Sequence, residues 1–289
     1  MRSDYELRAY EPEHKQDYLG LLREAWGEGA MSEAEFDWWF DGNPAGSLRS
    51  VAMLDGQVVG VAGHSFHRMV LGGEERVATF SVHATTHASA RGRGIFAALE
   101  RKHEQEATER GVAVVLAFAS APTAPIFLGP LGWAEIARLR VWARPLLRPK
   151  AGEASPALEV SGDAAAAWPN HVIRDDTFLR WRYLDSPKGY RAVSSSRGYA
   201  VVGRKRRGQR TAATVVDLVG EGVLRAALAQ AGGCRIALAL PARGQRAMFA
   251  SLGFAPTTYT LHFIGKPLAG ALDTDPRAWR FTLGDTDFF

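Results

Sequence analysis

The chain has 289 residues, of which 46% are hydrophobic and 23% charged, and it contains one cysteine, Cys234. A single cysteine excludes an intramolecular disulfide framework and a CxxC metal ribbon. The longest apolar run, 112–119, is far shorter than the roughly 18 residues of a membrane-spanning helix, and the charged start of the chain is not typical of a signal peptide. We therefore expect a cytoplasmic protein of two domains, with no membrane partner and no metal ion.

The net charge of +4 and the pI of about 9.3 raise the question of a nucleic-acid partner. Residues 1–150 carry 17 Lys and Arg and 19 Asp and Glu, whereas residues 151–289 carry 18 and 12, so the basic excess lies in the second half. Part of it is the run 204–207 (RKRR), which we interpret as a solvated hairpin turn, with contact to a polyanion as the alternative. No zinc-finger or helix-turn-helix signature accompanies it, and we do not expect a nucleic-acid partner.

Apolar spacing and turn residues predict a series of helices and hairpins in the first half of the chain. Helices are expected over 17–26 and 31–40, the second opened by the capping box of Ser32 and Glu35. Two hairpins follow, turning at 55–56 (Asp-Gly) and 72–73 (Gly-Gly). The remaining elements are a glycine-rich loop at 91–94, a helix at 94–110, a strand at 112–118, a short helix at 122–130 and a strand at 134–144.

A stretch rich in Pro, Gly and Ala separates two similar halves. We predict a linker over 146–168 between domains at 1–145 and 169–289. The second half is expected to contain a hairpin at 198–203 and 211–219, a helix at 222–231, a strand at 234–240, a helix at 242–251 and a strand at 257–265. The shared element order and the triplets LGW (131–133) and LGF (252–254) suggest a duplicated fold. The predicted fold class is α/β, with an α+β mixed sheet, mostly antiparallel and flanked by helices, in each of two domains.

The loop Arg91-Gly92-Arg93-Gly94 between a strand and a helix is the clearest functional signal. Glycines let backbone N–H groups point at a ligand, the helix N-terminus adds partial positive charge, and the two arginines add full charges. These features predict a site for a phosphate or pyrophosphate, with a solvent-exposed capping turn as the alternative. The loop lacks the Gly-Lys of a P-loop, and Ala97 stands where a Rossmann fingerprint has its third glycine.

The segment 86–96 (THASARGRGIF), followed by a helix and the LGW turn, resembles the GNAT superfamily of acyl-CoA N-acyltransferases. The resemblance covers 1–145 with a specific motif and 170–265 more weakly, as a second copy. Segments 178–183 and 284–287 also resemble parts of bacterial tandem-GNAT proteins. At the loop position the second copy has only 220–222 (GEG), without basic residues, so the resemblance implies a degenerate C-terminal copy and CoA binding by the first copy alone.

The resemblance also implies roles for individual residues. The CoA pyrophosphate would be held by Arg91, Gly92, Arg93, Gly94, Ile95 and Phe96, and the pantetheine arm by Ala84, Thr85 and Thr86. The expected cosubstrate is acetyl-CoA, and a small-molecule primary amine would attack the thioester directly. Two positions depart from the family pattern, because Phe96 replaces a small residue and Leu128 occupies the place of the usual general-acid tyrosine.

Candidates for catalysis and for acceptor binding come from three regions. The catalytic candidates are His83 and Ser81 in the strand before the loop, with Asp287 and the terminal carboxylate of Phe289 near the end of the chain. A neutral histidine can accept a proton at physiological pH, whereas His87 is expected to be structural. The acceptor-side candidates are Trp38, Trp39 and Asp41, whose carboxylate would suit a cationic amine. Since the two tryptophans are adjacent, they cannot both face one core stripe, and one of them could line a pocket.

Two other functions stay open at this point. The missing tyrosine and the degenerate second copy would fit a non-catalytic acyl-CoA-binding protein. The basic run at 204–207 would fit a tandem-GNAT transferase that takes its acyl group from aminoacyl-tRNA. The sequence identifies neither the amine nor the acyl chain, and it leaves open whether the chain forms a homodimer.

Overall fold

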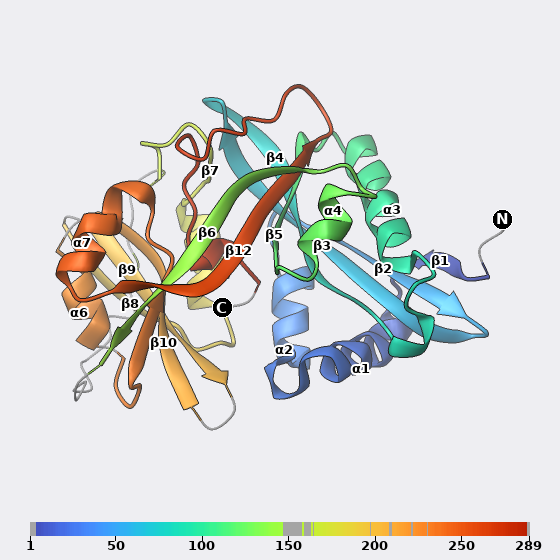
Figure 1. Ribbon diagram of the computed structural model, residues 1–289, viewed down its shortest axis with the longest axis horizontal. Helices are drawn as coiled ribbons and strands as arrows, with labels where there is room; N and C mark the ends of the chain where they lie inside the picture. Colours follow the sequence, from blue (N-terminus) through green and yellow to red (C-terminus); the bar gives the residue numbers. More distant parts are fainter. Residues whose placement is uncertain are drawn as a thin grey trace. The chain divides into compact units, whose positions relative to one another are not determined.

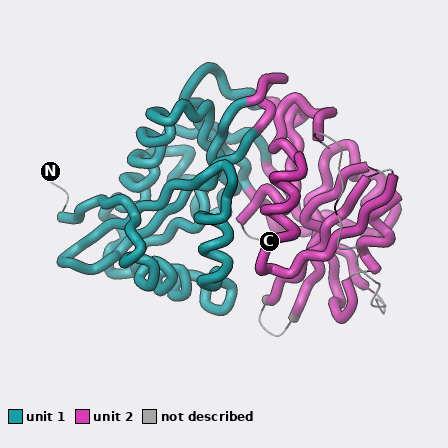
Figure 2. Tube along the Cα trace, turned by 180° about the vertical axis from the view of Figure 1, so that it is seen from behind, with its two compact units in different colours: residues 1–68, 76–137, 262–274 teal, residues 69–75, 138–261, 275–289 magenta. Residues whose placement is uncertain are grey.

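The computed structural model describes residues 4–146, 158, 163, 165–196, 198–207, 210–220, 222–229 and 231–287 (Figure 1). The chain forms two compact units that do not coincide with its two halves (Figure 2). Unit 1 comprises residues 1–68, 76–137 and 262–274, and unit 2 comprises residues 69–75, 138–261 and 275–289. Most of the predicted linker at 146–168 lies outside the described residues.

Unit 1 is built on a sheet in which one pair of strands is parallel. Its strands, in spatial order, are β1 (Glu6–Ala9), β2 (Ser47–Leu54), β3 (Gln57–Leu71), β4 (Glu74–Thr86), β5 (Val114–Ala119) and, from residue 262 on, β12 (Ala255–Pro267). The pairs β1–β2, β2–β3 and β5–β12 are antiparallel, whereas β4–β5 is parallel. The two predicted hairpins share β3, which is one strand of 15 residues.

Helices cover both faces of the unit 1 sheet. They are η1 (Pro12–His14), α1 (Lys15–Trp26), η2 (Gly27–Gly29), α2 (Glu33–Phe36), the π-helix η3 (Asp37–Asp41), η4 (Ala88–Ala90), α3 (Ile95–Glu109) and α4 (Ala124–Leu128). A Cβ placed on Gly60 of β3 would lie 2.6 Å from Ile95 of α3, and one on Gly63 would lie 2.6 Å from Phe40 of η3. Because residues 60 and 63 point to opposite faces of a strand, α3 and η3 lie on opposite faces of the sheet.

Unit 2 also contains a mixed arrangement of strands. Its strands, in spatial order, are β6 (Ala134–Pro145), β11 (Ile236–Ala239), β10 (Arg210–Gly220), β9 (Gly198–Arg207) and β8 (Arg191–Ser195), and β7 (His171–Val172) pairs with the end of β3. The β10–β11 pair is parallel, and β6–β11, β9–β10 and β8–β9 are antiparallel. The helices are α5 (Asp176–Leu179), the π-helix η5 (Arg180–Leu184), α6 (Leu224–Ala229), η6 (Arg243–Gln245), α7 (Arg246–Ser251) and η7 (Leu283–Asp285). In the described part of the chain, no helix is long and apolar enough to cross a membrane.

The prediction that the basic run 204–207 forms a turn is wrong. The run belongs to β9, whose pairing with β10 extends to Arg207 and Arg210. The apolar segments on each side form a ladder long enough to carry the basic residues into the strand, and residues 208–209 lie outside the described part of the chain.

Each unit contains a short α-helix that continues into a π-helix. In unit 1 the side chain of Ser32 caps α2, and a hydrogen bond of 2.8 Å from the Gly42 N–H to the Asp37 carbonyl closes η3. In unit 2 the side chain of Asp175 caps α5, and the corresponding bond from 185 to 180 is 2.9 Å long. The segments 37–46 (DWWFDGNPAG) and 180–189 (RWRYLDSPKG) align without gaps. Since π-helices are rare, this agreement is a strong structural likeness between the units.

Candidate active site

The chain between β4 and α3 forms an exposed loop with two left-handed glycines. Gly92 and Gly94 have φ angles of 79° and 77°, a region that other residues adopt only at a cost. Gly94 is the N-cap of α3, and among the described residues nothing beyond the chain neighbours lies within 4 Å of a Cβ placed on either glycine. A ligand can therefore approach the backbone N–H groups at the start of this 15-residue helix, where anions are favoured.

The two arginines of this loop are exposed and are held in different ways. The Nε of Arg91 donates a hydrogen bond of 3.3 Å to the carbonyl oxygen of Thr86, which fixes Arg91 beside the end of β4. Arg93 forms an ion pair with Asp4. Since an exposed ion pair contributes little to stability, Arg93 can exchange this carboxylate for a phosphate at small cost.

Strand β4 separates from β5 beyond Phe80. The described parallel register ends at the pair Phe80–Leu116, although β4 continues to Thr86 and β5 to Ala119. The end of β4 therefore presents a backbone edge that is not paired with β5. An edge of this kind can form hydrogen bonds with an extended ligand, as it would with another strand.

Ser81 and His83, the two catalytic candidates on β4, point to opposite faces of the sheet. Regular alternation would place residues 81 and 83 on one face. The Oγ of Ser81 donates a hydrogen bond of 2.8 Å to Glu100 Oε1 of α3, whereas His83, with φ of 49°, turns away from α3. The ring centroid of His83 lies 6.0 to 6.4 Å from those of Trp26, Trp39 and Phe40. The end of β4 thus carries one candidate on each face.

Tyr18 of α1 supports the irregular backbone at His83. Its hydroxyl donates a hydrogen bond of 3.3 Å to the carbonyl oxygen of His83. Tyr18 is fully buried, and this burial raises the pKa of its phenol, which therefore stays protonated at neutral pH. We infer that Tyr18 positions the strand rather than exchanging protons.

Behind Ser81 lies a group of buried polar side chains. Glu100 Oε2 is 3.0 Å from His64 Nε2, and His103 Nε2 is 2.9 Å from the Oγ of Ser50. His64, Glu100 and His103 have no exposed surface, and the two imidazole rings are 4.6 Å apart. Burial, together with the neighbouring His64, lowers the pKa of His103 well below its ordinary value, so that its ring is neutral.

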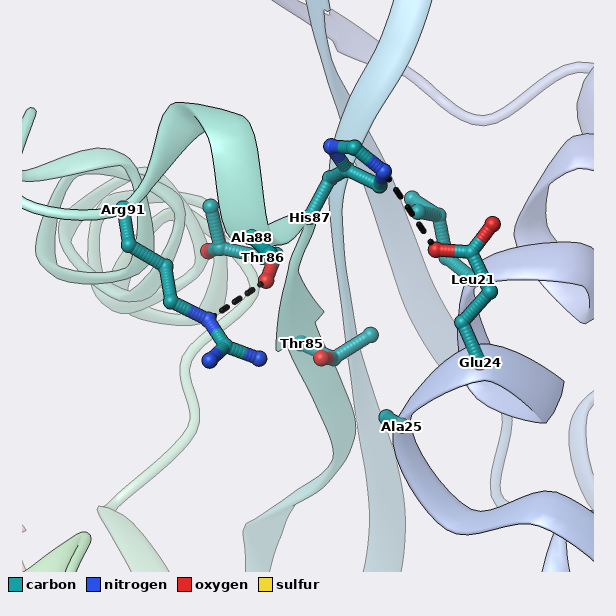
Figure 3. A pocket seen from close by; sticks show the side chains of 8 residues that line it. All are labelled: Leu21, Glu24, Ala25, Thr85, Thr86, His87, Ala88 and Arg91. Carbon is teal, nitrogen blue, oxygen red and sulfur yellow. Dashed lines mark hydrogen bonds and ion pairs between the residues drawn. The ribbon is translucent and has the colours of Figure 1, made fainter.

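His87 contributes to a small cavity between α1 and the end of β4 (Figure 3). His87 Nε2 lies 3.5 Å from Glu24 Oε2, and its Nδ1 lies 2.7 Å from the Oγ of Ser89. The remaining lining residues are Leu21, Ala25, Thr85, Thr86, Ala88 and Arg91. The contacts of His87 fit the structural role expected for it, and two residues expected to bind pantetheine share the cavity with an arginine of the loop.

The acceptor-side candidates are more enclosed than the sequence suggested. A role in lining an acceptor pocket stays a prediction, and Trp38 and Trp39 are only 8% and 2% exposed, so both lie in the core. The reason is local packing, because Trp39 packs toward His83 and the Trp38 ring meets that of Trp39 edge to face at 5.4 Å. Asp41 is exposed, but its carboxylate lies 2.5 Å from the guanidinium of Arg49.

The C-terminal candidates belong to unit 2. Asp287 is half-buried near the end of the described chain, and Phe289 lies outside the described residues. The neighbouring Asp285 forms a buried ion pair of 2.5 Å with Arg174. A catalytic role for Asp287 stays a prediction. Among the described residues, no group of three or more His, Cys, Asp and Glu side chains is placed to hold a metal ion.

Sequence patterns did not identify Glu100 or Glu24 as site residues. Glu100 follows Leu99 on a buried part of α3, and an acidic residue among core positions is a signal that could have found it. Glu24 gave no such signal, because an acidic residue on an exposed helix face is ordinary.

Comparison with known proteins shows what the region that contains this site is similar to. Residues 6–136 match the family model described as an acetyltransferase (GNAT) domain. This part of the chain, slightly less than half of its length, resembles a GNAT domain. It includes the open end of β4, the glycine loop and α3, and apart from 69–75 it lies within unit 1.

Solved structures share the fold of this chain. A probable N-acyltransferase from Enterococcus faecalis V583 is 13% identical, with 91% of this chain and 72% of that chain covered and a TM-score of 0.62. A candidate acetyltransferase from Pyrococcus horikoshii is 14% identical, with 100% and 96% covered and a TM-score of 0.65. N-myristoyltransferase from Saccharomyces cerevisiae, solved with bound myristoyl-CoA, is 11% identical, with 92% and 83% covered and a TM-score of 0.66. No curated protein matches the sequence.

Proposed function

We propose that the chain is an acyl-CoA-dependent N-acyltransferase that uses acetyl-CoA and acts in the cytoplasm. The observation that carries the proposal is the exposed left-handed glycine loop at the start of α3, next to a strand end that has separated from β5. The loop offers N–H donors and positive charge to a pyrophosphate, and the strand edge offers hydrogen bonds to an extended pantetheine arm. The GNAT match over residues 6–136 supports this assignment.

The residues around the loop suit this ligand. We assign the pyrophosphate to the backbone of 91–96 and the pantetheine arm to 84–86. Arg91 is already held by Thr86, so its charge is available without a large ordering cost. Phe96, which departs from the family pattern, packs its ring 5.3 Å from that of Phe127 in α4. Its side chain therefore turns into the domain and leaves the loop accessible.

The chemistry we propose is direct attack of a small primary amine on the thioester. The only cysteine, Cys234, is buried in unit 2, which argues against an acyl-cysteine intermediate. The position of the usual general-acid tyrosine holds Leu128, which cannot donate a proton. Among the described residues, Ser81 and His83 lie next to the open strand edge and can exchange protons. The aromatic rings around His83 favour an amine with an apolar substituent.

We also propose that unit 2 derives from a second copy of the fold that does not bind CoA. The matching helices α2–η3 and α5–η5 support this origin. The final strands support it as well, because β6 pairs with β11 in unit 2 and β12 pairs with β5 in unit 1. Between β10 and α6 only 221–223 remain, and α6 has six residues against the 15 of α3.

Calorimetric titration of the full chain with acetyl-CoA tests the proposed function. We expect one site per chain and a rise in melting temperature with ligand concentration. CoA release, followed by thiol detection over a panel of primary amines, tests turnover. Absence of binding at millimolar acetyl-CoA would contradict the proposal. Binding without CoA release would favour a non-catalytic acyl-CoA-binding protein, and steeply salt-dependent tRNA binding without CoA binding would favour an aminoacyl-tRNA substrate.

A further inference from the structure

We propose that Ser81 accepts the proton of the attacking amine and passes its own proton to Glu100. This inference rests on the proposed acyl transfer. Ser81 is the first residue of β4 beyond the last parallel pair with β5, so it stands where the strand edge opens. It is half-buried, whereas Glu100 and His64 behind it are fully buried. Ser81 therefore connects the open edge with the interior group.

The hydrogen bond of Ser81 determines what its hydroxyl can do. The Oγ donates its proton to Glu100 Oε1 at 2.8 Å. A serine hydroxyl has one proton and two lone pairs, so the Oγ can only accept a further hydrogen bond from a ligand. A bond to a carboxylate is among the stronger kinds in proteins and holds the hydroxyl in this orientation. Ser81 thus presents an acceptor to an N–H group at the strand edge.

The second oxygen of Glu100 is held as well. His64 Nε2 lies 3.0 Å from Oε2, and because a carboxylate only accepts hydrogen bonds, Nε2 carries the proton. The Nδ1 atoms of His64 and His103 are buried, and within the described residues neither has a hydrogen-bond partner. A bare lone pair there costs less than an unsatisfied N–H group, which favours a hydrogen on the Nε2 atom of each ring. Glu100 is therefore oriented by two donors and remains able to take a proton on Oε1.

Stability alone does not account for this buried group. Replacing buried ionisable networks with apolar residues is often neutral or stabilising. The neighbouring core positions Ile95 and Leu99 are apolar and fully buried, so an apolar side chain at position 100 would fit the surroundings. A buried acid that is hydrogen-bonded to a half-buried hydroxyl beside an open edge instead points to chemistry.

The proposed step balances without a further reactant. As the amine nitrogen bonds to the thioester carbon, an N–H proton moves to Ser81 Oγ, and the Ser81 proton moves to Glu100 Oε1. The C–S bond then breaks, and its electron pair leaves on the CoA sulfur. The products are the amide and the thiolate, with Glu100 as the carboxylic acid. Return of the proton through Ser81 to the sulfur restores the carboxylate and gives CoA as the thiol.

The equivalent place in unit 2 lacks this chemistry. There the last parallel pair is Val215–Ala239, so the first residue beyond it is Val216. Val216 is fully buried, and its side chain cannot accept a proton. The Ser81–Glu100 pair is therefore a property of the unit that carries the glycine loop.

Steady-state kinetics of full-chain variants tests the inference, with the primary amine that gives the fastest CoA release. We expect Ser81→Ala and Glu100→Gln to lower kcat about 100-fold, a loss typical of general-base catalysis, with the Kd for acetyl-CoA within about threefold of wild type. Ser81→Thr, which keeps the hydroxyl, should retain most of kcat. A loss in kcat with an unchanged Kd for acetyl-CoA is a split that a merely structural role would not produce. The control is Thr79→Val, which removes a buried hydroxyl two residues earlier on β4.

The outcomes separate this inference from the proposed function. A Ser81→Ala variant that keeps kcat within about threefold would overturn the role of Ser81 and leave acyl transfer intact. If Glu100→Gln does not fold, Ser81→Ala and Ser81→Thr still decide. A wild-type chain that binds acetyl-CoA but releases no CoA with any amine would overturn both ideas. A chain that does not bind acetyl-CoA would contradict the proposed function itself.

Discussion

The two units have a similar strand arrangement at β4 and β10, but the ends of these strands differ in whether another segment packs over them. β4 and β10 each run parallel to the next strand for three residue pairs and then continue beyond it. In unit 1 the continuation is mostly half-buried and leads into the exposed loop, whereas in unit 2 residues 216–218 are buried. There η7 packs against β10, and a Cβ on Gly284 would lie 3.0 Å from the carbonyl oxygen of Val216. The sheet alone thus does not make a ligand site, because the segment that covers the strand end decides its accessibility.

In unit 2, buried ion pairs between side chains hold η7 against the end of β10. Asp217 of β10 accepts hydrogen bonds from Arg174 at 3.2 Å and from Arg280 at 2.7 Å. Arg174 also bonds to Asp285 of η7 at 2.5 Å, and all four side chains are almost fully buried. Burial alone would raise the pKa of Asp217, but the two arginines outweigh it and hold this pKa far below its ordinary value. In unit 2 the strand end therefore belongs to a buried ion-pair network that stabilises the fold, whereas in unit 1 the strand end is open.

The largest predicted effect comes from removing the charge of Asp217 from this ion-pair network. Asp217→Asn leaves Arg174 and Arg280 without a shared counter-charge, and we expect it to lower the free energy of unfolding by about 3–5 kcal/mol. Urea denaturation followed by tryptophan fluorescence measures the change. The matched control is Asp275→Asn, at an exposed pair with Arg277, which should cost less than about 0.5 kcal/mol. A loss below about 1 kcal/mol in Asp217→Asn would show that the ion pairs do not hold the cover.

The next effect compares the two loops directly. Gly94→Glu places a negative charge where we assign the pyrophosphate, and we expect acetyl-CoA to bind about 100-fold more weakly, a loss of about 2.7 kcal/mol. Gly222 is the control in unit 2, because its φ is 85° and no described atom beyond its neighbours lies within 4 Å of an added Cβ. Gly222→Glu therefore carries similar backbone strain, and calorimetry should give an unchanged Kd. Equal losses in the two variants would contradict the assignment of CoA to unit 1.

The features that could be predicted from the sequence are local ones. The hairpin turn at 55–56 lies where Asp55 and Gly56 have positive φ angles of 50° and 78°, as an Asp-Gly turn requires. Ser32 and Glu35 form the expected capping box at the start of α2. The strand–loop–helix order around 91–94 was also predicted correctly, because glycine and helix-capping signals lie within a few residues of the structure they specify.

The features that could not be predicted depend on contacts between distant residues. The hydrogen bond from Ser81 to Glu100 spans 19 residues, and the one from His64 to Glu100 spans 36. The alternation of β4 predicted one face for 81 and 83, but the positive φ of His83 separates them. The pairing of β12 with β5 joins segments more than 130 residues apart. The periodicity of a sequence does not show which distant residues come into contact. The glycine loop could therefore be predicted from the sequence, whereas the group of Ser81, Glu100 and His64 could not.

The third prediction contrasts the pH dependence of stability that arises from one group in each unit, His103 and Asp163. Below about pH 6.5 the unfolded chain protonates His103 and the folded chain does not. The free energy of unfolding therefore decreases as the pH is lowered, by up to about 1.4 kcal/mol per pH unit. In unit 2, burial would raise the pKa of Asp163, but hydrogen bonds from His171 and from backbone N–H groups lower it to about 2. Its contribution is therefore present above the unfolded pKa near 3.9 and is lost only as the pH falls toward 2.

Urea unfolding between pH 7.5 and 5 checks this contrast. His103→Gln should reduce the slope of unfolding free energy against pH in this range, because it removes a group that the folded state keeps neutral. Asp163→Asn should lower stability at every pH in the range and leave the slope unchanged. A slope that is the same in His103→Gln as in wild type would show that the histidine does not titrate on unfolding.

The smallest predicted effect concerns Asp41, whose counterpart in the aligned segment of unit 2 is Leu184. The Asp41–Arg49 pair is partly exposed, so Asp41→Asn should change the free energy of unfolding by less than about 1 kcal/mol. Arg49 keeps its place, since its guanidinium also lies 4.2 Å from the ring centroid of Tyr10. If Asp41 attracts a cationic amine, the variant should raise the KM for the amine several-fold and leave kcat unchanged, as the loss of uniform binding does. An unchanged KM would mean that the carboxylate of Asp41 interacts with Arg49 alone and not with the amine. The acceptor would then be oriented by the aromatic rings around His83.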